Sequence, residues 1–344
     1  VYSYNYSMEN NSSSSFDFIA LGDITTDAFI RLKDAKTNCD VDHENCQLCL
    51  RFGDKVPYES VTIVPAVGNS PNASVCAARL GLKSALVTNL GDDRNGDEAI
   101  KALEKNGVST KLVRRHQNQK TNYHYVLWYQ DDRTILIKHE DYDYTLPSLN
   151  TKWLYLSSLG ENSLTLHDTL AAYLQNNPEI KLAFQPGTFQ MKLGVEKLKK
   201  IYARTEIFFC NVEEAKRITG QNQASPESLL GYIRKLGPKI VVITDGKKGA
   251  YVYSAKGGAG EHFFMPPYPD PKPPLERTGA GDSFASTIVS ALALGKDLPE
   301  ALRWGPVNSM SVVQQIGAQA GLLTRPQLEK FLADAPLDYK PKRI

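Results

Sequence analysis

The sequence predicts an α/β protein with a central, mostly parallel sheet between two layers of helices and a small β-sheet lid outside it. Short apolar runs alternate with segments of helical spacing along most of the chain, which is the pattern of a parallel sheet covered on both faces. Two stretches, residues 29–65 and about 119–140, instead alternate β-branched and aromatic residues, which favours antiparallel strands. Most polar motifs directly follow a predicted strand, and ligands bind at that end of parallel strands.

The large domain begins with a buried strand and then alternates strands with helices. Gly81 and Gly107 end the first two helices, since glycine readily takes the left-handed conformation that follows a helix. In chain order the predicted elements are strand 16–21, helix 72–80, strand 84–88, helix 96–106 and strands 153–157, 181–184, 206–209 and 239–244. In the second lid stretch, residues 123–129 and 134–137 are predicted strands.

The chain therefore divides into a tail, a large domain and a lid. A lid would exclude water from a reacting substrate, whereas an ordinary β extension would serve dimer contact. The same segment can have both functions. The tail, rich in Tyr, Asn and Ser, is expected to be disordered, and whether the residues before Met8 are native stays open. The parts are residues 1–15 for the tail, residues 16–28, 66–118 and 141–344 for the α/β domain, and residues 29–65 and 119–140 for the lid.

Length and composition restrict the class of protein. The 344 residues carry a net charge of +2, so no strong electrostatic field favours nucleic acid or a membrane surface as a partner. No apolar run approaches the roughly 20 residues of a membrane span, and no secretory leader is visible. Because the five cysteines are odd in number and Cys76 and Cys210 lie in apolar segments, we expect a reduced, cytoplasmic setting.

Residues 277–284, Arg-Thr-Gly-Ala-Gly-Asp-Ser-Phe, are the most informative motif in the chain. Gly279, Ala280 and Gly281 leave their backbone N–H groups unshielded, and the positive end of the following helix points at the same place. Such a site can stabilise a phosphoryl group during transfer, with Asp282 accepting a proton from the attacking hydroxyl. Taken alone, the motif is also compatible with a left-handed cap or a tight loop before a helix.

Several further motifs follow one another in a characteristic order along the chain. They are residues 67–72 followed by 77–81, residues 211–214, residues 244–249, residues 278–282, Asn308 and residues 316–318. With these motifs the chain resembles the ribokinase-like, or PfkB, carbohydrate kinases over about residues 17–332. The resemblance implies a ribokinase-like three-layer sandwich with a β-sheet lid, ATP as the phosphoryl donor, Mg²⁺ as a cofactor and a small-molecule substrate.

The resemblance assigns three residues to the substrate. Asp27 is implied to accept hydrogen bonds from sugar hydroxyls, for which a carboxylate offers two strong acceptor oxygens. Gly68 and Asn72 are implied to contact the same substrate. From the residues alone, Asp27 is also compatible with a turn or a cap, and residues 68–72 with a tight strand-to-helix turn whose N-cap is Asn72.

Other residues are assigned to the nucleotide. Thr244, Gly246 and Gly249 form a turn after a predicted strand, and their backbone and hydroxyl donors are implied to hold phosphate and ribose; a generic β-turn is the alternative. Asn308 is implied to lie near the adenine.

A third pair of residues is assigned to the metal. Asn211 and Glu214 lie one turn apart at the start of a predicted helix and share a face. The resemblance implies that they position Mg²⁺ through its water ligands. Without the resemblance, Asn211 is an N-cap and Glu214 its capping-box partner, and both roles can coexist.

The chain also departs from the family pattern. Val67 replaces the first Gly of the N-terminal signature, and Asn69 stands where Lys is common. Glu276 replaces an Asp that helps bind a monovalent cation in ribokinase-type members, and Arg277 brings a competing positive charge. The last two changes argue against K⁺ activation.

A cysteine-rich segment in the first lid stretch lies outside the resemblance. Cys39, His43, Cys46 and Cys49 could together bind Zn²⁺ as a Cys₃His site. Structural zinc sites usually have two paired ligand knuckles, and only one is present here. We therefore favour buried thiols that pack the lid.

The sequence thus predicts an ATP-dependent kinase that phosphorylates a sugar hydroxymethyl group and forms a homodimer through its lid. Because Asn69 replaces Lys, an unphosphorylated sugar such as ribose, fructose or a ketodeoxy acid is favoured over a sugar phosphate. A nucleoside kinase and a non-catalytic sugar or nucleotide sensor are the alternatives. A Rossmann-type dehydrogenase lacks support, since no G-x-G-x-x-G follows the first strand. The aromatic residues that could stack a base, or instead pack the lid, are Tyr123, Tyr125, Trp128 and Tyr129.

Overall fold

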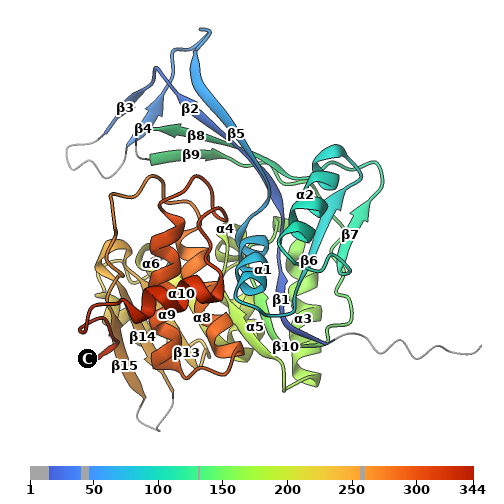
Figure 1. Cartoon of the computed structure of the whole chain (residues 1–344). Helices are drawn as coiled ribbons and strands as arrows, with labels where there is room; N and C mark the ends of the chain where they lie inside the picture. The colour runs from blue at the N-terminus through green and yellow to red at the C-terminus, as the bar shows by residue number, and fades with distance from the viewer. Residues whose placement is uncertain (1–14, 40–45, 131, 256–259) are drawn as a thin grey trace, which may run out of the picture.

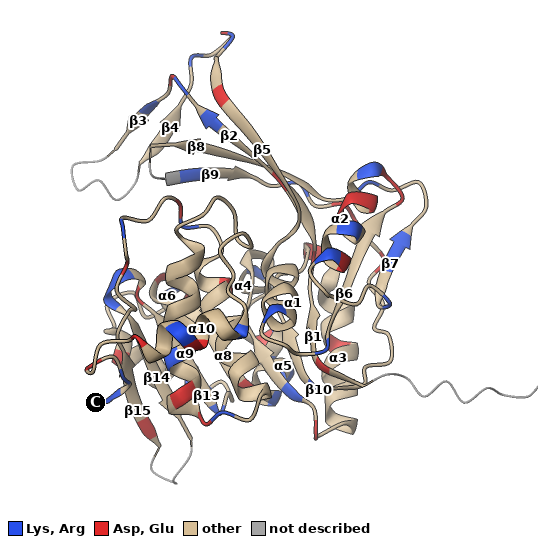
Figure 2. Cartoon of the chain, viewed as in Figure 1, with Lys and Arg blue, Asp and Glu red and all other residues tan. Residues whose placement is uncertain are grey.

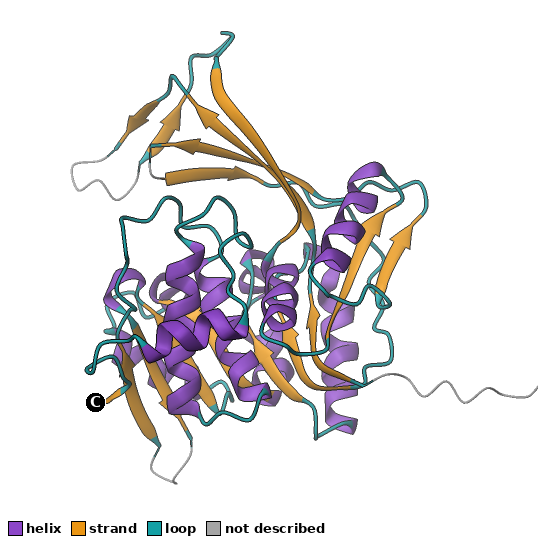
Figure 3. Ribbon diagram, viewed as in Figure 1, coloured by secondary structure: helices purple, strands orange, loops and turns teal. Residues whose placement is uncertain are grey.

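The structure of the protein is a computed structural model that describes residues 15–39, 46–130, 132–255 and 260–344. The predicted disordered tail lies outside the described residues except for its last residue, and so does His43. Helices, one large sheet and a separate curved sheet make up most of the molecule (Figure 3).

The large sheet lies at the centre of the molecule (Figure 1). Its strands, in the described residues, are β1 (Phe16–Leu21), β6 (Ser84–Gly91), β7 (Val113–His116), β10 (Thr151–Leu156), β11 (Lys181–Phe184), β12 (Thr205–Asn211), β13 (Ile240–Thr244), β14 (Ala250–Ser254), β15 (Glu261–Met265) and β16 (Lys342–Arg343). Their order is β16-β15-β14-β13-β12-β11-β10-β1-β6-β7. Neighbours from β7 to β13 are parallel, and the unpredicted edge from β13 to β16 is antiparallel. The predicted mostly parallel sheet is confirmed.

Helices cover both faces of this sheet. Successive residues of β1 alternate between two buried clusters, Phe18 and Ala20 in one and Ile19 and Leu21 in the other. Both faces are apolar for that reason, and the strands appear in the sequence as continuous apolar runs. One cluster takes in α1 (Asn69–Arg79), α2 (Arg94–Lys105), α8 (Ala280–Ala293), α9 (Leu298–Val312) and α10 (Arg325–Ala333), and the other takes in α3 (Leu164–Asn176), α5 (Val195–Arg204), α6 (Val212–Thr219) and α7 (Pro226–Arg234).

The lid is a separate four-stranded sheet that stands away from the large sheet (Figure 1). Its strands are β2 (Thr25–Leu32), β5 (Tyr58–Val67), β8 (Tyr123–Tyr129) and β9 (Asp132–Leu136), in the order β5-β2-β8-β9. We expected antiparallel strands throughout this sheet, but β2 is antiparallel to β5 and parallel to β8. β2 also begins earlier than the predicted lid boundary, and Asp27 consequently lies on the lid sheet rather than at the edge of the first strand.

The cysteines of the lid differ from the prediction. Cys39 and Cys46 form a disulfide beside the two-stranded ribbon of β3 (Lys36–Asn38) and β4 (Gln47–Cys49). Cys46 and Cys49 are exposed, so the expectation of buried thiols packing the lid is wrong. Sulfurs joined in a disulfide cannot supply thiolates to a Zn²⁺ ion. The expected reduced state does not hold for this pair, whereas Cys76 and Cys210 are buried free thiols.

The surface carries charges of both signs. Lys and Arg residues are interspersed with Asp and Glu over the helices and the lid (Figure 2), in keeping with the net charge of +2. None of the helices in the described part of the chain has the length and apolarity to span a membrane.

Candidate active site

Asp282 lies in the first turn of α8, immediately after the glycine-rich turn. Gly279 is the N-cap residue of α8 and takes the left-handed conformation, with φ 78° and ψ 2°. A Cβ at this position would collide with Ala318, so both the backbone angle and the available space require glycine. The turn thereby places the N-terminus of α8 next to Gln185, which directly follows β11.

Three side-chain amides surround the carboxylate of Asp282. Asn69 and Gln185 donate to Oδ1 at 2.7 and 3.2 Å, and Asn72 donates to Oδ2 at 2.9 Å. Burial raises the pKa of Asp282, while the amide donors and the positive charge of Arg133 oppose that rise. A carboxylate with a raised pKa is a better proton acceptor, as a general base requires.

The predicted phosphoryl-binding donors differ in their surroundings. Ala280 donates its N–H to the carbonyl of Arg277 at 3.3 Å, a turn bond that competes with an anion. Gly281 faces open space, because a Cβ there would meet only Gln185 Nε2, at 4.0 Å. The Gly281 side of the turn is therefore the accessible approach for a phosphoryl group.

A cavity of about 210 Å³ adjoins this turn. Its lining brings Thr244, Gly246 and Gly249 of the predicted nucleotide loop together with Ala280 and Gly281. The proline-rich loop 266–274 and helix α9 supply an apolar wall. An apolar wall at one end and exposed backbone donors at the other suit a nucleotide, whose base is flat and whose phosphates are anionic.

Asn308 does not line this cavity, which corrects its predicted contact with the nucleotide. It is fully buried in α9, where its amide donates to Thr287 Oγ1 and its carbonyl accepts the N–H of Leu323, both at 2.9 Å. Both ends of the side chain are thus engaged inside the protein. The next residues, Ser309 and Met310, line the cavity instead, because successive positions of a helix point in different directions.

Asn211 and Glu214 form a reciprocal cap at the start of α6. Glu214 accepts the N–H of Asn211 at 2.9 Å, and Asn211 Oδ1 accepts the N–H of Glu214 at 2.8 Å. Burial raises the pKa of Glu214, the Asn211 bond opposes this, and the negative charge of Asp282 raises it further. The capping role is confirmed, and Glu214 lies within electrostatic reach of Asp282. Among the described residues no group of three or more His, Cys, Asp and Glu side chains gathers as a metal site.

Asp27, predicted to bind the substrate, lies on the inner face of the lid beside a histidine. Asp27 of β2 and His124 of β8 are direct neighbours in register, with His124 Nδ1 3.5 Å from Asp27 Oδ1. Asp27 Oδ1 and His124 Nε2 are buried and have no hydrogen-bond partner in the described structure. Buried polar atoms without partners are costly, so these two atoms are suited to a polar ligand.

Gly68 and Asn72 connect the lid with Asp282. Gly68 has φ 117° at the N-cap of α1, and a Cβ there would come within 2.9 Å of the Asp23 carbonyl, so glycine permits this close approach. Asn72, one turn later, is buried and donates to Asp282. The lid strand, the start of α1 and the predicted base therefore meet at one place.

Known proteins are similar to this chain in both sequence and fold. The chain matches the model of the pfkB family carbohydrate kinases over residues 39–325. It belongs to this family. The ribokinase of Bacillus subtilis (strain 168) is 29% identical over 298 residues, which cover 82% of this chain and 92% of that protein. The chain is accordingly an ATP-dependent carbohydrate kinase.

Solved structures agree on the ribokinase fold. The Arabidopsis thaliana ribokinase complexed with ribose and ATP has a TM-score of 0.77 at 20% identity, with 93% of this chain and 99% of that chain covered. The Methanocaldococcus jannaschii nucleoside kinase has a TM-score of 0.74 at 17% identity, with 93% and 99% covered. The fold therefore does not by itself distinguish a sugar from a nucleoside as the substrate.

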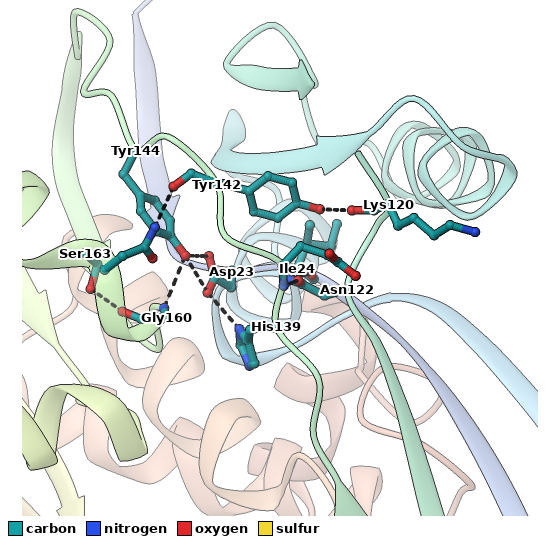
Figure 4. Close-up of polar contacts among 11 residues, drawn as sticks. Asp23, Ile24, Lys120, Asn122, His139, Tyr142, Tyr144, Gly160 and Ser163 are labelled. Carbon is teal, nitrogen blue, oxygen red and sulfur yellow. Dashed lines mark hydrogen bonds and ion pairs between the residues drawn. The ribbon is translucent and has the colours of Figure 1, made fainter. Parts of the chain in front are cut away.

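In this carbohydrate kinase a second carboxylate, Asp23, organises the place where the lid joins the large domain. The Tyr144 hydroxyl donates to both carboxylate oxygens of Asp23, at 2.8 and 2.9 Å, and His139 Nδ1 lies 3.1 Å from Asp23 Oδ2 (Figure 4). The ring centroid of His139 lies 5.3 Å from that of His124 on the lid and 5.4 Å from that of Phe189 in α4 (Thr188–Leu193). These contacts fasten the inner face of the lid to the large domain.

Beside this cluster, Asn122 hydrogen-bonds the backbones of two other segments of the chain. It donates to the Ile24 carbonyl at 3.0 Å and accepts the Glu140 N–H at 2.8 Å (Figure 4). None of Asp23, Asn122, His139 and Tyr144 was predicted from the sequence as a site residue. Only Asp23 carries a signal in the sequence, because it directly follows the first strand and Gly22.

Three buried oxygen atoms near the glycine turn are candidate ligands for a monovalent cation of the kind that ribokinase-type kinases bind. Glu276 Oε2, Thr278 Oγ1 and Gln314 Oε1 are buried without hydrogen-bond partners in the described structure. Their two segments are joined by a hydrogen bond of 2.8 Å from the Leu275 N–H to the Val313 carbonyl. Oxygen atoms left without donors fit the ligand preference of an alkali cation. Arg277, whose charge argued against K⁺, is exposed.

Proposed function

We propose that this kinase transfers the γ-phosphoryl group of ATP to a hydroxymethyl group of an unphosphorylated, uncharged sugar, with Asp282 as the general base. The observation that supports this most strongly is the position of the Asp282 carboxylate. It lies at the start of α8 and is held by side-chain amides, while the two preceding residues, Ala280 and Gly281, line the cavity predicted to take the nucleotide. The attacking hydroxyl and the phosphoryl group would meet between the carboxylate and this cavity.

In this mechanism Asp282 accepts the proton of the attacking hydroxyl while the oxygen approaches the γ-phosphorus. The Gly281 side of the turn and the positive end of α8 stabilise the charge on the transferring group. Mg²⁺, when bound with ATP, neutralises phosphate charge. Asp27, with His124 beside it, hydrogen-bonds the sugar hydroxyls and fixes the acceptor's orientation, and orientation alone lowers such a barrier substantially.

The charges around the predicted sugar site favour a neutral substrate. Asn69, where the family commonly has Lys, contacts Asp282 and carries no charge, and the Asp27 and Asp23 carboxylates lie on the lid side. An anionic substituent placed beside them would be repelled. We therefore favour ribose or fructose over a ketodeoxy acid or a sugar phosphate.

The nucleoside alternative loses support from the lid aromatics. Tyr125 is 48% exposed and lies on the face of the lid opposite His124, since side chains alternate along a strand. Tyr123 stacks against Tyr125 on that same outer face. Trp128 is buried on the inner face, where Arg31 lies over its ring at 4.6 Å. Tyr123 and Tyr125, which face outward, therefore cannot sandwich a base inside the site.

A substrate panel tests the proposal. With ATP and Mg²⁺ we expect ADP release with ribose or fructose. We expect a kcat/KM at least about 100-fold lower with fructose 6-phosphate, because a misplaced charge costs several kcal/mol, and a lower kcat/KM with adenosine, because the outward-facing lid tyrosines cannot stack its base. Omission of the sugar serves as the control for ATP hydrolysis. Turnover of adenosine with none of any sugar would establish the nucleoside kinase instead, and binding without turnover of any compound would favour a sensor.

We further propose that the outer face of the lid forms a homodimer interface. Ile63, Tyr125 and Leu136 lie in one row across the sheet and are 56%, 48% and 51% exposed. A contiguous apolar patch of this kind is typical of an association surface, and a self-complementary sheet face suits a two-fold dimer.

Charge on this face tests the dimer. We expect the double variant Ile63→Glu, Tyr125→Glu to be a monomer in light scattering at a concentration where the parent is a dimer, because a buried carboxylate without a partner is strongly unfavourable. The matched control is Leu337→Glu, at a position that is 100% exposed and far from the lid in sequence. A parent protein that is itself monomeric would contradict the interface.

We also expect K⁺ to stimulate the kinase, in contrast to the expectation from sequence. Glu276, Thr278 and Gln314 would hold the ion, and it would supply a positive charge behind the glycine turn. We expect kcat/KM to rise at least about tenfold when 100 mM K⁺ replaces tetramethylammonium. The Glu276→Gln variant should lose most of that gain, because a charged ligand oxygen is replaced by a neutral one. Equal rates in both salts would contradict the cation site.

A further inference from the structure

The amides that contact Asp282 are themselves held by outer partners. An amide side chain presents a donor at one end and an acceptor at the other, and only the donor end can stabilise a carboxylate. Gln185 and Asn72 both present their donor ends to Asp282. What fixes the opposite, acceptor end of each amide therefore decides whether Asp282 receives its hydrogen bonds.

On one side the outer partner is Tyr155. This residue lies in β10, is fully buried, and donates its hydroxyl hydrogen to Gln185 Oε1. Its role as donor is secured by burial and the nearby charge of Asp282, which together keep the pKa of Tyr155 well above its ordinary value. With Oε1 occupied by this donor, Gln185 turns Nε2 towards Asp282.

On the other side the outer partner is Gln319. Its Nε2 donates to the Asn72 side-chain oxygen at 3.0 Å and to the Ala66 carbonyl at 2.7 Å. Ala66 has a positive φ of 60°, an unfavourable backbone conformation for a residue other than glycine. The bond from Gln319 therefore supports both this backbone conformation and the orientation of Asn72.

We propose that Tyr155 and Gln319 are positioning residues for catalysis: acting through Gln185 and Asn72, they keep two amide donors on Asp282 and so hold it ionised for proton abstraction. The proposal rests on the proposed function, since it presumes that Asp282 is the base. Both residues are buried, and neither lines the cavity predicted to take the nucleotide. The effect of Tyr155 on the reaction would therefore pass through Gln185, and that of Gln319 through Asn72 and the Ala66 backbone.

The direction of the effect follows from the groups around Asp282. Burial favours the neutral acid of Asp282, whereas the amide donors and the positive charge of Arg133 favour the carboxylate. Loss of an amide donor removes a hydrogen bond that stabilises the carboxylate, so the pKa of Asp282 rises. A base must be ionised to act, and the acidic limb of the kcat/KM profile therefore moves to higher pH.

The test uses Tyr155→Phe, which removes one hydroxyl and keeps the ring, and Gln319→Leu. For each we expect the acidic limb of kcat/KM, measured with ATP, Mg²⁺ and ribose, to move up by about one pH unit, the size of a lost hydrogen bond to a charged group. We expect the rate on the high-pH plateau to fall less than about threefold. The matched control is Tyr339→Phe, another buried tyrosine whose hydroxyl donates to the backbone carbonyl of Arg303, and its profile should match the parent's.

A second readout needs no substrate. In ligand-free protein carrying ¹³C at the aspartate carboxyl carbons, the Asp282 signal is assigned by its absence in Asp282→Asn, and its titration midpoint should rise in both variants. An unchanged midpoint and an unchanged acidic limb in folded Tyr155→Phe and Gln319→Leu would overturn the positioning role. A uniform loss of rate at all pH values would identify both residues as purely structural. If Asp282→Asn itself retains full turnover, the proposed base fails, whatever the two midpoints show.

Discussion

Replacement of Asp282 by Asn is expected to lower kcat by about a thousandfold, which is within the range of a general base. Asn has nearly the same shape as Asp but cannot accept a proton from the attacking hydroxyl. The lost charge is partly buried and surrounded by Asn69, Asn72 and Gln185, so one amide donor would then face the new amide instead of an oxygen. We expect the midpoint of thermal unfolding to change little, because removal of a poorly solvated charge offsets the weakened hydrogen bond.

Two measurements separate catalysis from binding in this variant. Calorimetry with a non-hydrolysable ATP analogue and Mg²⁺ should give a dissociation constant within about threefold of the parent's, since the nucleotide cavity is lined by other residues. The matched control is Asp338→Asn, an exposed position outside the site, which should keep the parent's kcat. Unchanged turnover in Asp282→Asn would refute its role as the base, and a simultaneous loss of nucleotide binding would indicate a structural role.

The large domain could be predicted from sequence because its signals are local. Strands β1 and β11 have the predicted bounds, since strands buried on both faces appear as short uninterrupted apolar runs. The predicted nucleotide loop at 244–249 and the glycine-rich turn were both expected at the carboxyl ends of the strands, and Thr244, Gly246 and Gly249 line one cavity with Ala280 and Gly281. Parallel strands bring their carboxyl ends to the same edge, so residues far apart in sequence meet there.

The contacts around Asp282 could not be predicted, because they join distant parts of the chain. Asn69 and Gln185 lie 213 and 97 residues from Asp282 in sequence, and nothing local marks their amides as its partners. Asn69 was noted only as the replacement of a common Lys. Asn308 shows the opposite failure: the family motif placed it at the nucleotide, but the pitch of α9 turns it into the core.

The lid was predicted as an element, but its faces and boundaries were not. The alternation of residues 123–129 indicates a strand but does not say which face is turned inward. Pairing with β2 decides this, since Asp27 lies opposite His124 and the tyrosines at 123 and 125 consequently face outward. The same pairing extends β2 back to Thr25, which moves Asp27 from the large domain to the lid.

This position of Asp27 leads to the second large expected effect. In Asp27→Asn we expect the KM for the sugar to rise about 10–100-fold, because hydrogen bonds between a carboxylate and substrate hydroxyls are worth about 1.5–3 kcal/mol. The KM for ATP should stay within about twofold of the parent's. The matched control is Asp54→Asn, an exposed lid position whose carboxylate pairs with Arg51 and accepts the Lys55 N–H.

The same substitution should affect stability in the opposite direction. Asp27 Oδ1 is buried without a hydrogen-bond partner, so in the ligand-free protein the folded state carries an unfavourable buried carboxylate oxygen that the sugar would satisfy. Without sugar, we expect Asp27→Asn to unfold at the same or a higher temperature than the parent. Saturating sugar should stabilise the parent far more than the variant, since only a ligand that binds the folded state raises the midpoint of thermal unfolding. A variant that unfolds at a markedly lower temperature, with the sugar KM unchanged, would show that Asp27 supports the lid rather than the substrate. The two readouts therefore distinguish a residue retained for function at a cost in stability from one retained for the fold.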